Sequence, residues 1–140
     1  MKYLVDTNVI SELLKKAPNE NVVRWMMAHA TELCLSVISI EEMRFGALFM
    51  PEGKRKRALT SSIEKLISQY RDSIWAFDAS AAERCARFHA FAVQNGRTPA
   101  IEDLMIAAIA SSHGAPVVTR RVRDFEYLDV EIINPFEEVN

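Results

Sequence analysis

Short apolar runs alternate along the chain with longer segments in which apolar residues recur every three or four positions. The short runs predict buried strands at residues 2–5, 33–36, 74–77, 116–119 and 131–133. The longer segments predict helices at residues 9–15, 21–29, 40–49, 57–70, 79–94 and 100–112. Strands separated by helices favour parallel pairing, with helices on both faces of the sheet. We therefore expect an α/β fold, a three-layer α/β/α sandwich around a mostly parallel central sheet of four to five strands.

The length and composition of the chain restrict the kinds of protein that it can be. Its 140 residues suit one domain, so we expect residues 1–140 to form a single domain. The net charge of -2 excludes a general binder of polyanions, and a nucleic-acid substrate would have to meet local basic clusters. Such clusters occur at residues 54–57 and 120–123, although each also fits an ordinary solvated face. Without a signal-peptide pattern or a long apolar span, a cytoplasmic protein that makes no membrane contact is expected.

The first apolar run ends at Asp6, which Thr7 and Asn8 follow directly. Functional side chains gather beyond the carboxyl ends of parallel strands, so Asp6 is a candidate site residue. It also fits a helix cap, but Thr7 and Asn8 lie nearer the helix and can take that role. Further acids near a strand end or a helix start are Glu42, Asp103 and Asp124. Carboxylates gathered from distant parts of a chain repel one another, which predicts a cation among them and a hydrolase that uses Mg²⁺ or Mn²⁺.

Each of these further acids also has a purely structural interpretation. For Asp124 it is the cap of a short turn before Phe125, or a surface pair with Arg120 or Arg123. Ser39 and Glu42 fit a capping box at a helix start, although Gly46 on the same helix face suggests close approach by backbone or substrate. Asp103 fits a favourable acid in a first helical turn, but it shares its face with apolar residues, where an unpaired charge is costly. Asp78 follows the third predicted strand, and we expect it to be a helix cap only.

Four segments together resemble the PIN-domain ribonucleases, and among them the VapC-type toxins, which include proteins called FitB-like or plasmid-stability proteins. The segments are LVDTNVIS at residues 4–11, SIEEMRFG at 39–46, DLMIAA at 103–108, and VTR at 118–120 with DF at 124–125. Each segment alone is a weak signal. Their order and spacing extend over essentially the whole chain, and this makes the resemblance specific.

The resemblance implies a set of site residues. It assigns Asp6, Glu42 and Asp103 as catalytic, metal-binding acids. Pocket-lining residues would be Thr7, Asn8 and Thr119, and we expect Ser39 and Arg121 to line the same pocket. Members often carry Asp or Asn where this chain has Arg121, so a fourth catalytic, metal-binding acid would have to be Asp124. Arg121 could instead hold the substrate phosphate through paired hydrogen bonds.

The resemblance also implies an activity and partners. It implies a PIN-like fold and Mg²⁺- or Mn²⁺-dependent endoribonuclease activity, in which a water or hydroxide attacks the phosphodiester bond. It further implies a homodimer and a small, VapB-like, DNA-binding antitoxin that joins the toxin in a hetero-oligomer.

Alternative functions remain open from the residues alone. A catalytically silent RNA- or protein-binding domain of the same fold would use the acids as helix caps. A DNA nuclease is possible because metal-site residues do not distinguish the sugar. A phosphoacceptor receiver domain is disfavoured because Asp6 lacks an acidic neighbour and Arg120 stands where a lysine would be needed.

Overall fold

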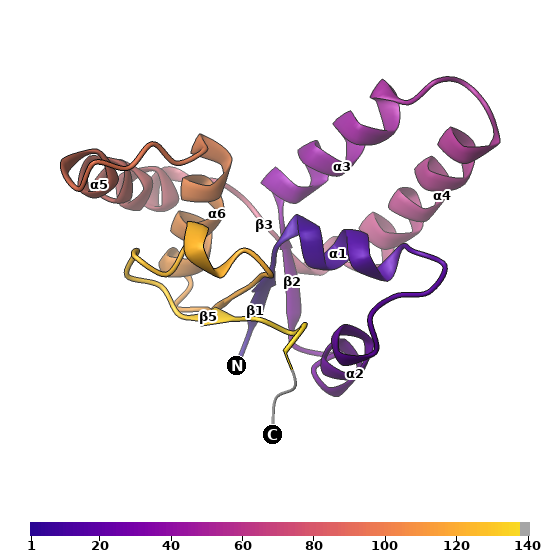
Figure 1. Ribbon diagram of the computed structural model, residues 1–140, viewed down its shortest axis with the longest axis horizontal. Coiled ribbons are helices and arrows are strands. Elements are labelled where there is room, and N and C mark those ends of the chain that lie inside the picture. Colours follow the sequence, from indigo (N-terminus) through magenta and orange to yellow (C-terminus); the bar gives the residue numbers. More distant parts are fainter. Residues whose placement is uncertain (138–140) are drawn as a thin grey trace.

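The computed structural model describes residues 1–137 and has a central sheet with helices on both faces (Figure 1). The strands are β1 (Tyr3–Val5), β2 (Leu33–Ser36), β3 (Ile74–Trp75), β4 (Val117–Val118) and β5 (Ile132–Ile133). They lie in the order β3-β2-β1-β4-β5, and every neighbouring pair is parallel. The predicted sheet is therefore confirmed, with five strands in the described part of the chain.

All six predicted helices are present, with shifted ends. They are α1 (Thr7–Leu13), α2 (Glu20–Ala28), α3 (Val37–Phe49), α4 (Lys54–Gln69), α5 (Ala79–Gln94) and α6 (Ile101–Ser112). Helix α1 begins two residues earlier than predicted because Asp6 caps it, and α3 begins three residues earlier because Ser36 caps it. Two short 3-10 turns, Arg71–Ser73 and Val122–Asp124, were not predicted from the sequence.

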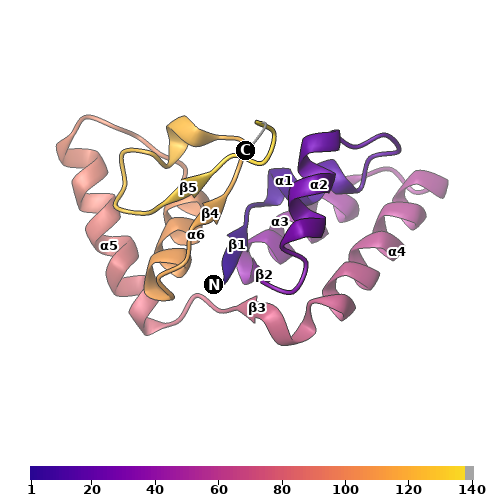
Figure 2. The same cartoon turned by 90° about the horizontal axis from the view of Figure 1, so that it is seen from below.

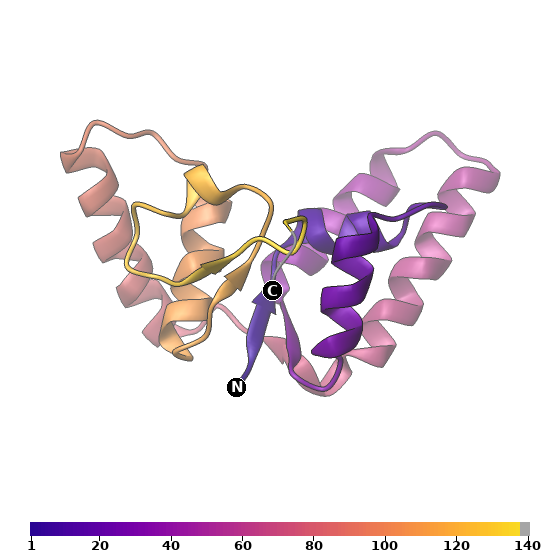
Figure 3. The same cartoon turned by 60° about the horizontal axis from the view of Figure 1, so that its bottom comes forward.

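Three layers follow from the alternation of side chains along the strands. Neighbouring residues of a strand point to opposite faces of its sheet. Leu4 and Val117 accordingly pack in one core with α5 and α6, whereas Val5 and Val118 pack in a second core with α1 to α4. Figures 2 and 3 show the same division, with α5 and α6 on one side of the strands and α2 and α4 on the other.

The sheet order determines where a site can form. β1 pairs with β2 on one side and with β4 on the other, so the connections leave the centre of the sheet in opposite directions. Ligands of open α/β sheets bind at such a point, outside the carboxyl ends of the strands. Asp6 follows β1 there, and Thr119 follows β4. Within residues 1–137, no helix is long and apolar enough to cross a membrane.

Candidate active site

Asp6 lies at the centre of a polar cluster at the carboxyl edge of the sheet, and its side chain is 0% exposed. Its Oδ1 accepts a hydrogen bond of 2.8 Å from the backbone N–H of Thr7, so Asp6 is the cap of α1. The expectation that Thr7 or Asn8 would cap this helix was wrong. A carboxylate at this position suits both roles because it has two oxygens, and Oδ2 is left for other donors.

Two polar side chains hold the second oxygen of Asp6. The Nδ2 of Asn8 and the Oγ1 of Thr119 each donate to Oδ2 of Asp6 at 2.8 Å. Asn8 Nδ2 also donates to Thr119 Oγ1 at 3.1 Å, which links the ends of β1 and β4. Donors to the charged form of a buried carboxylate offset its desolvation, so this network keeps Asp6 in one orientation.

Glu42 reaches the same edge from α3. Thr7 Oγ1 donates to Glu42 Oε1 at 2.9 Å and lies 2.8 Å from Ser39 Oγ. Burial raises the pKa of Glu42, the hydrogen bond from Thr7 opposes the rise, and the charge of Asp6 adds to it. Ser39 and Glu42 do not form the predicted capping box, because the cap of α3 is Ser36, whose Oγ accepts from the N–H of Ser39 at 3.1 Å.

Gly46 lies one turn beyond Glu42 on α3. A Cβ at this position would meet nothing within 4 Å, so the close approach by backbone that Gly46 suggested does not occur within residues 1–137. The space beside it belongs to a hollow of about 150 Å³ that Glu42, Leu59 and Ile63 help to line. Because Gly46 has no side chain, the hollow next to Glu42 has room for part of a bound molecule.

Asp103 is buried at the start of α6, where its side chain meets Arg121. The guanidinium forms a fork on the carboxylate, with Nη2 at 2.6 Å from Oδ1 and Nη1 at 3.1 Å from Oδ2. Burial raises the pKa of Asp103, and Arg121 opposes the rise. Burial and the ion pair thus act on this carboxylate in opposite directions.

Arg121 also contacts two other acids. Its Nη2 lies 3.3 Å from Asp6 Oδ2, and its Nη1 lies 3.4 Å from Asp124 Oδ2. Burial would lower the pKa of Arg121, but the hydrogen bond to Asp103 and the charge of Asp6 outweigh it and leave the pKa raised. The guanidinium is therefore the positive charge around which three of the four predicted acids are arranged.

Asp124 lies at the outer rim of the cluster. It ends the short turn Val122–Asp124, and its side chain is 49% exposed. In residues 1–137 its side chain has one ion pair, with Arg121, rather than the pairing with Arg120 or Arg123 that the sequence also allowed. Asp124 thus joins the cluster from its solvent-exposed side, through Arg121.

The donor atoms of this cluster suit a hard cation, but their arrangement centres on Arg121. The side chains of Asp6, Glu42 and Asp103 offer only oxygen, the ligand that Mg²⁺ and Mn²⁺ prefer. Yet among residues 1–137, no three acidic, histidine or cysteine side chains are placed together so that they could hold a metal ion. The residue types therefore fit the implied metal, while the guanidinium takes the space between Asp6 and Asp103.

A polar hollow of about 530 Å³ opens directly beside Asp103 and Arg121. Arg97 and Arg123 also line it, and the guanidinium of Arg97 lies 3.9 Å from the centre of the Tyr127 ring. The buried hydroxyl of Tyr127 has no hydrogen-bond partner in the described residues. Cationic side chains around an open hollow next to clustered acids are suited to a phosphate-bearing ligand.

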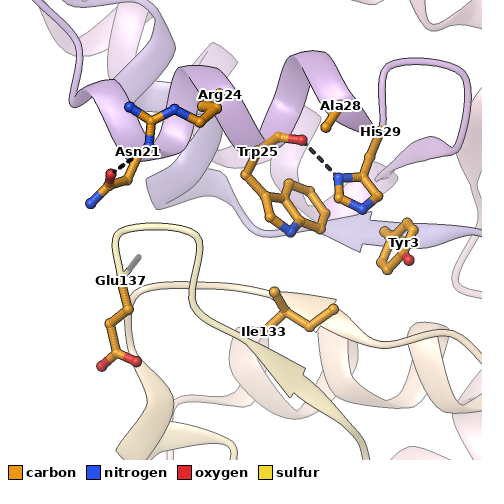
Figure 4. A pocket seen from close by; sticks show the side chains of 8 residues that line it. All are labelled: Tyr3, Asn21, Arg24, Trp25, Ala28, His29, Ile133 and Glu137. Carbon is orange, nitrogen blue, oxygen red and sulfur yellow. Dashed lines mark hydrogen bonds between the residues drawn. The ribbon is translucent and has the colours of Figure 1, made fainter. Parts of the chain in front are cut away.

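A second hollow, of about 420 Å³, is lined by none of the four acids (Figure 4). Tyr3, Trp25 and His29 form its aromatic side, where the rings of Trp25 and His29 stack at 4.1 Å. His29 Nδ1 lies 2.8 Å from the backbone oxygen of Trp25, which Figure 4 marks with a dashed line. The acid cluster is the stronger candidate for an active site because charged groups with perturbed pKa values converge there.

The sequence as a whole matches a known family. The pattern of the PIN domain family fits residues 3–130, which include every one of the four acids. The chain belongs to the PIN domain family. This PIN domain is similar to two named bacterial proteins. It is 38% identical over 136 residues to the VapC ribonuclease Y4jK of Sinorhizobium fredii, covering 96% of this chain and 97% of the relative. It is 36% identical over 137 residues to the toxin FitB of Neisseria gonorrhoeae, covering 96% and 99%.

Solved structures agree with the sequence comparison. The fold superposes on a chain of FitAB bound to an IR36 DNA fragment with a TM-score of 0.91 and 35% identity, covering 99% of this chain and 98% of that one. The resemblance to VapC-type and FitB-like proteins and the PIN-like fold are thereby confirmed.

The sequence pointed to the acids but did not indicate which basic side chain neutralises their charge. Arg121 was predicted to line the pocket and to hold the substrate phosphate, and no periodicity indicates that its side chain turns back onto Asp103. Arg97 and Tyr127 were not singled out at all. An arginine at the position where family members often carry Asp or Asn was the available signal for the ion pair, whereas Arg97 and Tyr127 offered none.

Proposed function

We propose that residues 1–140 act as a single PIN domain that cleaves RNA as a Mg²⁺- or Mn²⁺-dependent endoribonuclease, the toxin of a VapBC-type toxin–antitoxin module. The observation that carries the proposal is the convergence of Asp6, Glu42 and Asp103 at the carboxyl edge of the sheet. Asp6 and Asp103 are buried charges in this cluster, which is an expensive arrangement for helix caps alone. The similarity to a protein named as a VapC ribonuclease supports the choice of RNA.

Asp6, Glu42 and Asp103 would hold the divalent cation, and Asp124 would contribute from the rim as a fourth acid. When bound, such a cation supplies a water of lowered pKa and positive charge near the phosphate. Asn8 and Thr119 keep Asp6 oriented, and Thr7 does the same for Glu42. These supporting bonds matter because a catalytic group must be held within a few tenths of an ångström of its working position.

Burial raises the pKa of Glu42 in the metal-free site, so a cation bound beside it would favour the ionised carboxylate. The substrate phosphates would lie along the polar hollow, where Arg97 and Arg123 can neutralise them. Arg121 would then pair with the phosphate at the cleavage point.

The partners that we propose follow from the same relatives. A small, DNA-binding antitoxin would hold the toxin in a hetero-oligomer, and the toxin itself would form a homodimer. The structure of FitAB on DNA, which superposes over nearly the whole chain, supports this assembly. Purification of the protein with the product of the neighbouring gene, followed by mass measurement of the complex, would test it.

One observation favours the silent RNA- or protein-binding alternative. Arg121 neutralises the acids, and Asp6 is indeed a helix cap, as that alternative predicts. A cleavage assay separates the two functions. We expect Asp103→Asn to reduce RNA cleavage at least about 100-fold, because removal of one group that stabilises developing charge has effects of that size.

The matched control is Glu102→Gln, which removes an exposed acid from the same helical turn and should leave cleavage unchanged within about twofold. EDTA should abolish cleavage by the wild-type protein, and excess Mg²⁺ or Mn²⁺ should restore it. Full cleavage by a folded Asp103→Asn protein, or cleavage that resists EDTA, would refute the metal-dependent mechanism. Asp124→Asn in the same assay measures the contribution of the rim acid.

A further inference from the structure

Arg121 lies where its guanidinium contacts three of the four acids at once. Its guanidinium contacts Asp103 through both nitrogens, Asp6 at 3.3 Å and Asp124 at 3.4 Å. Within residues 1–137, no other basic side chain makes an ion pair with any of the three. A planar guanidinium that bridges carboxylates takes up the same oxygen atoms that a divalent cation would need.

Asp6 is fixed in place by bonds that do not involve this arginine. Asp6 Oδ1 is held by the N–H of Thr7, and its Oδ2 is held by Asn8 and Thr119. The backbone of Arg121 is anchored separately, since its N–H donates to Thr119 Oγ1 at 3.0 Å. The side chain of Arg121 can therefore leave while Asp6 and the loop keep their positions.

We propose that Arg121 is a built-in counter-ion of the metal-free site, which competes with the divalent cation for Asp103 and Asp6 and must swing outward before the cation can bind. The inference rests on the proposed metal-dependent function and adds a regulatory step to it. The charge of the acids is balanced in either state, first by the guanidinium and then by the cation.

The structure offers a path for this movement. The Arg121 side chain is 41% exposed and lines the hollow of about 530 Å³ together with Asp124. Asp124 is half-exposed and lies on the outer side of the guanidinium, so it can keep one ion pair as the arginine turns away from Asp103. In the outward position the guanidinium would stand in the hollow where we place the substrate phosphates. Arrival of the cation would thus make the arginine available to the RNA.

The competition can be measured without any cleavage assay. Titration of Mn²⁺ into the metal-free protein, with unbound Mn²⁺ counted by electron paramagnetic resonance, gives the affinity directly. We expect Arg121→Ala to bind Mn²⁺ about tenfold more tightly than the wild-type protein, the change that corresponds to loss of one competing charge-assisted hydrogen bond. Arg121→Gln, which retains a polar side chain of similar length, should show the same direction and provides a second variant if alanine impairs folding.

Arg120→Ala is the matched control. It removes the same charge from the neighbouring position, but the guanidinium of Arg120 lies over the ring of Phe136 at 4.6 Å and not on the acids. Its Mn²⁺ affinity should stay within about twofold of the wild-type value. Equal or weaker Mn²⁺ binding by Arg121→Ala than by Arg120→Ala would overturn the inference while leaving the metal-dependent nuclease intact. Failure of all variants and the wild-type protein to bind Mn²⁺ would overturn both.

A measurement on the wild-type protein avoids the question of folding altogether. In the metal-free state, the guanidinium N–H signals of Arg121 should be resolved in nuclear magnetic resonance spectra because Asp103 holds them. Saturation with Mg²⁺ should remove that restraint and broaden the signals. Arg84, whose Nη1 donates to Ser111 Oγ at 3.0 Å, serves as the internal control and should not change. Unchanged Arg121 signals at saturating Mg²⁺ would contradict the displacement.

Discussion

Single side chains of this cluster can serve the fold and the proposed chemistry together. Asp6 caps α1 with one oxygen and collects the donors of Asn8 and Thr119 with the other. From the sequence, capping and catalysis were alternatives for Asp6, but the structure shows that the capping contact leaves the second oxygen directed at the site. Glu42 differs, because its carboxylate makes no cap and lies in surroundings that raise its pKa.

The raised pKa of Glu42 predicts how stability depends on pH in metal-free protein. The folded protein holds a proton on Glu42 at pH values where the unfolded chain has lost it, so the free energy of unfolding falls as pH rises through the raised pKa. The destabilisation is fully present above that pKa and is relieved as pH falls toward the ordinary value. Glu42→Gln keeps the bond from Thr7 and should raise Tm at neutral pH by about 1–3 °C.

Thermal unfolding in EDTA across a pH series would check this prediction. The gain in Tm from Glu42→Gln should shrink as the pH approaches the ordinary range of a carboxyl group. Glu41→Gln is the matched control, because Glu41 is the exposed neighbour on the same helix and should show no such trend. A gain that grows toward acid pH would contradict the sign.

At the scale of elements, the helix starts decide which acids face the site. Ser36 rather than Ser39 caps α3, and this places Ser39 inside the first turn, where it meets Thr7. Asp78 caps α5 as predicted, through a bond of 2.9 Å from the N–H of Ala81 to its Oδ1. Helix α5 packs along α6 in the same core, so the cap of α5 indirectly supports the helix that carries Asp103.

The cap of α5 provides a prediction for stability alone. Asp78→Ala should lower the free energy of unfolding by about 1 kcal/mol, because one N–H at the helix start loses its partner. Urea unfolding would measure the change, and the dependence on urea concentration should stay the same if unfolding remains a single step. Asp72→Ala removes a nearby exposed acid that is not a cap and should change stability by less than about 0.5 kcal/mol. Equal effects of the two changes would show that charge, and not the cap, is responsible.

The whole molecule assembles the site from parts of the chain that are far apart in sequence. Asp6 and Thr119 are brought together by the pairing of β1 with β4, and Asp103 arrives on α6. An unfolded chain has no such cluster, so a cation that binds there binds only the folded state and stabilises it.

Divalent cations should therefore raise Tm. At a concentration about ten times Kd, Mg²⁺ or Mn²⁺ should raise the Tm of the wild-type protein by about 3–5 °C, and EDTA should reverse the shift. Asp103→Asn should show a much smaller shift, whereas Glu102→Gln should keep the full one. Absence of any shift with both ions would count against a metal site at these acids.

The sequence by itself determined the class of the fold and the identity of the acids. Buried strands are unbroken apolar runs in the sequence, and helices are segments in which apolar residues recur every three or four positions. Both patterns arise because the side chains that face the core recur at a fixed spacing along each element. An apolar run that ends at Asp6 marks the carboxyl edge of β1, since a charge cannot continue into the core without a partner. Family motifs around Glu42 and Asp103 then identified the remaining acids of the cluster.

Only the tertiary structure decided which basic side chain neutralises the charge of those acids. The pairing of Arg121 with Asp103 joins positions 18 apart in the chain, and its contact with Asp6 joins positions 115 apart. Such contacts depend on the order of strands and on the turn after β4, neither of which leaves a periodic signal in the sequence. Local patterns record what each segment buries, whereas the charge that a carboxylate meets is determined by whichever distant segment the fold brings beside it.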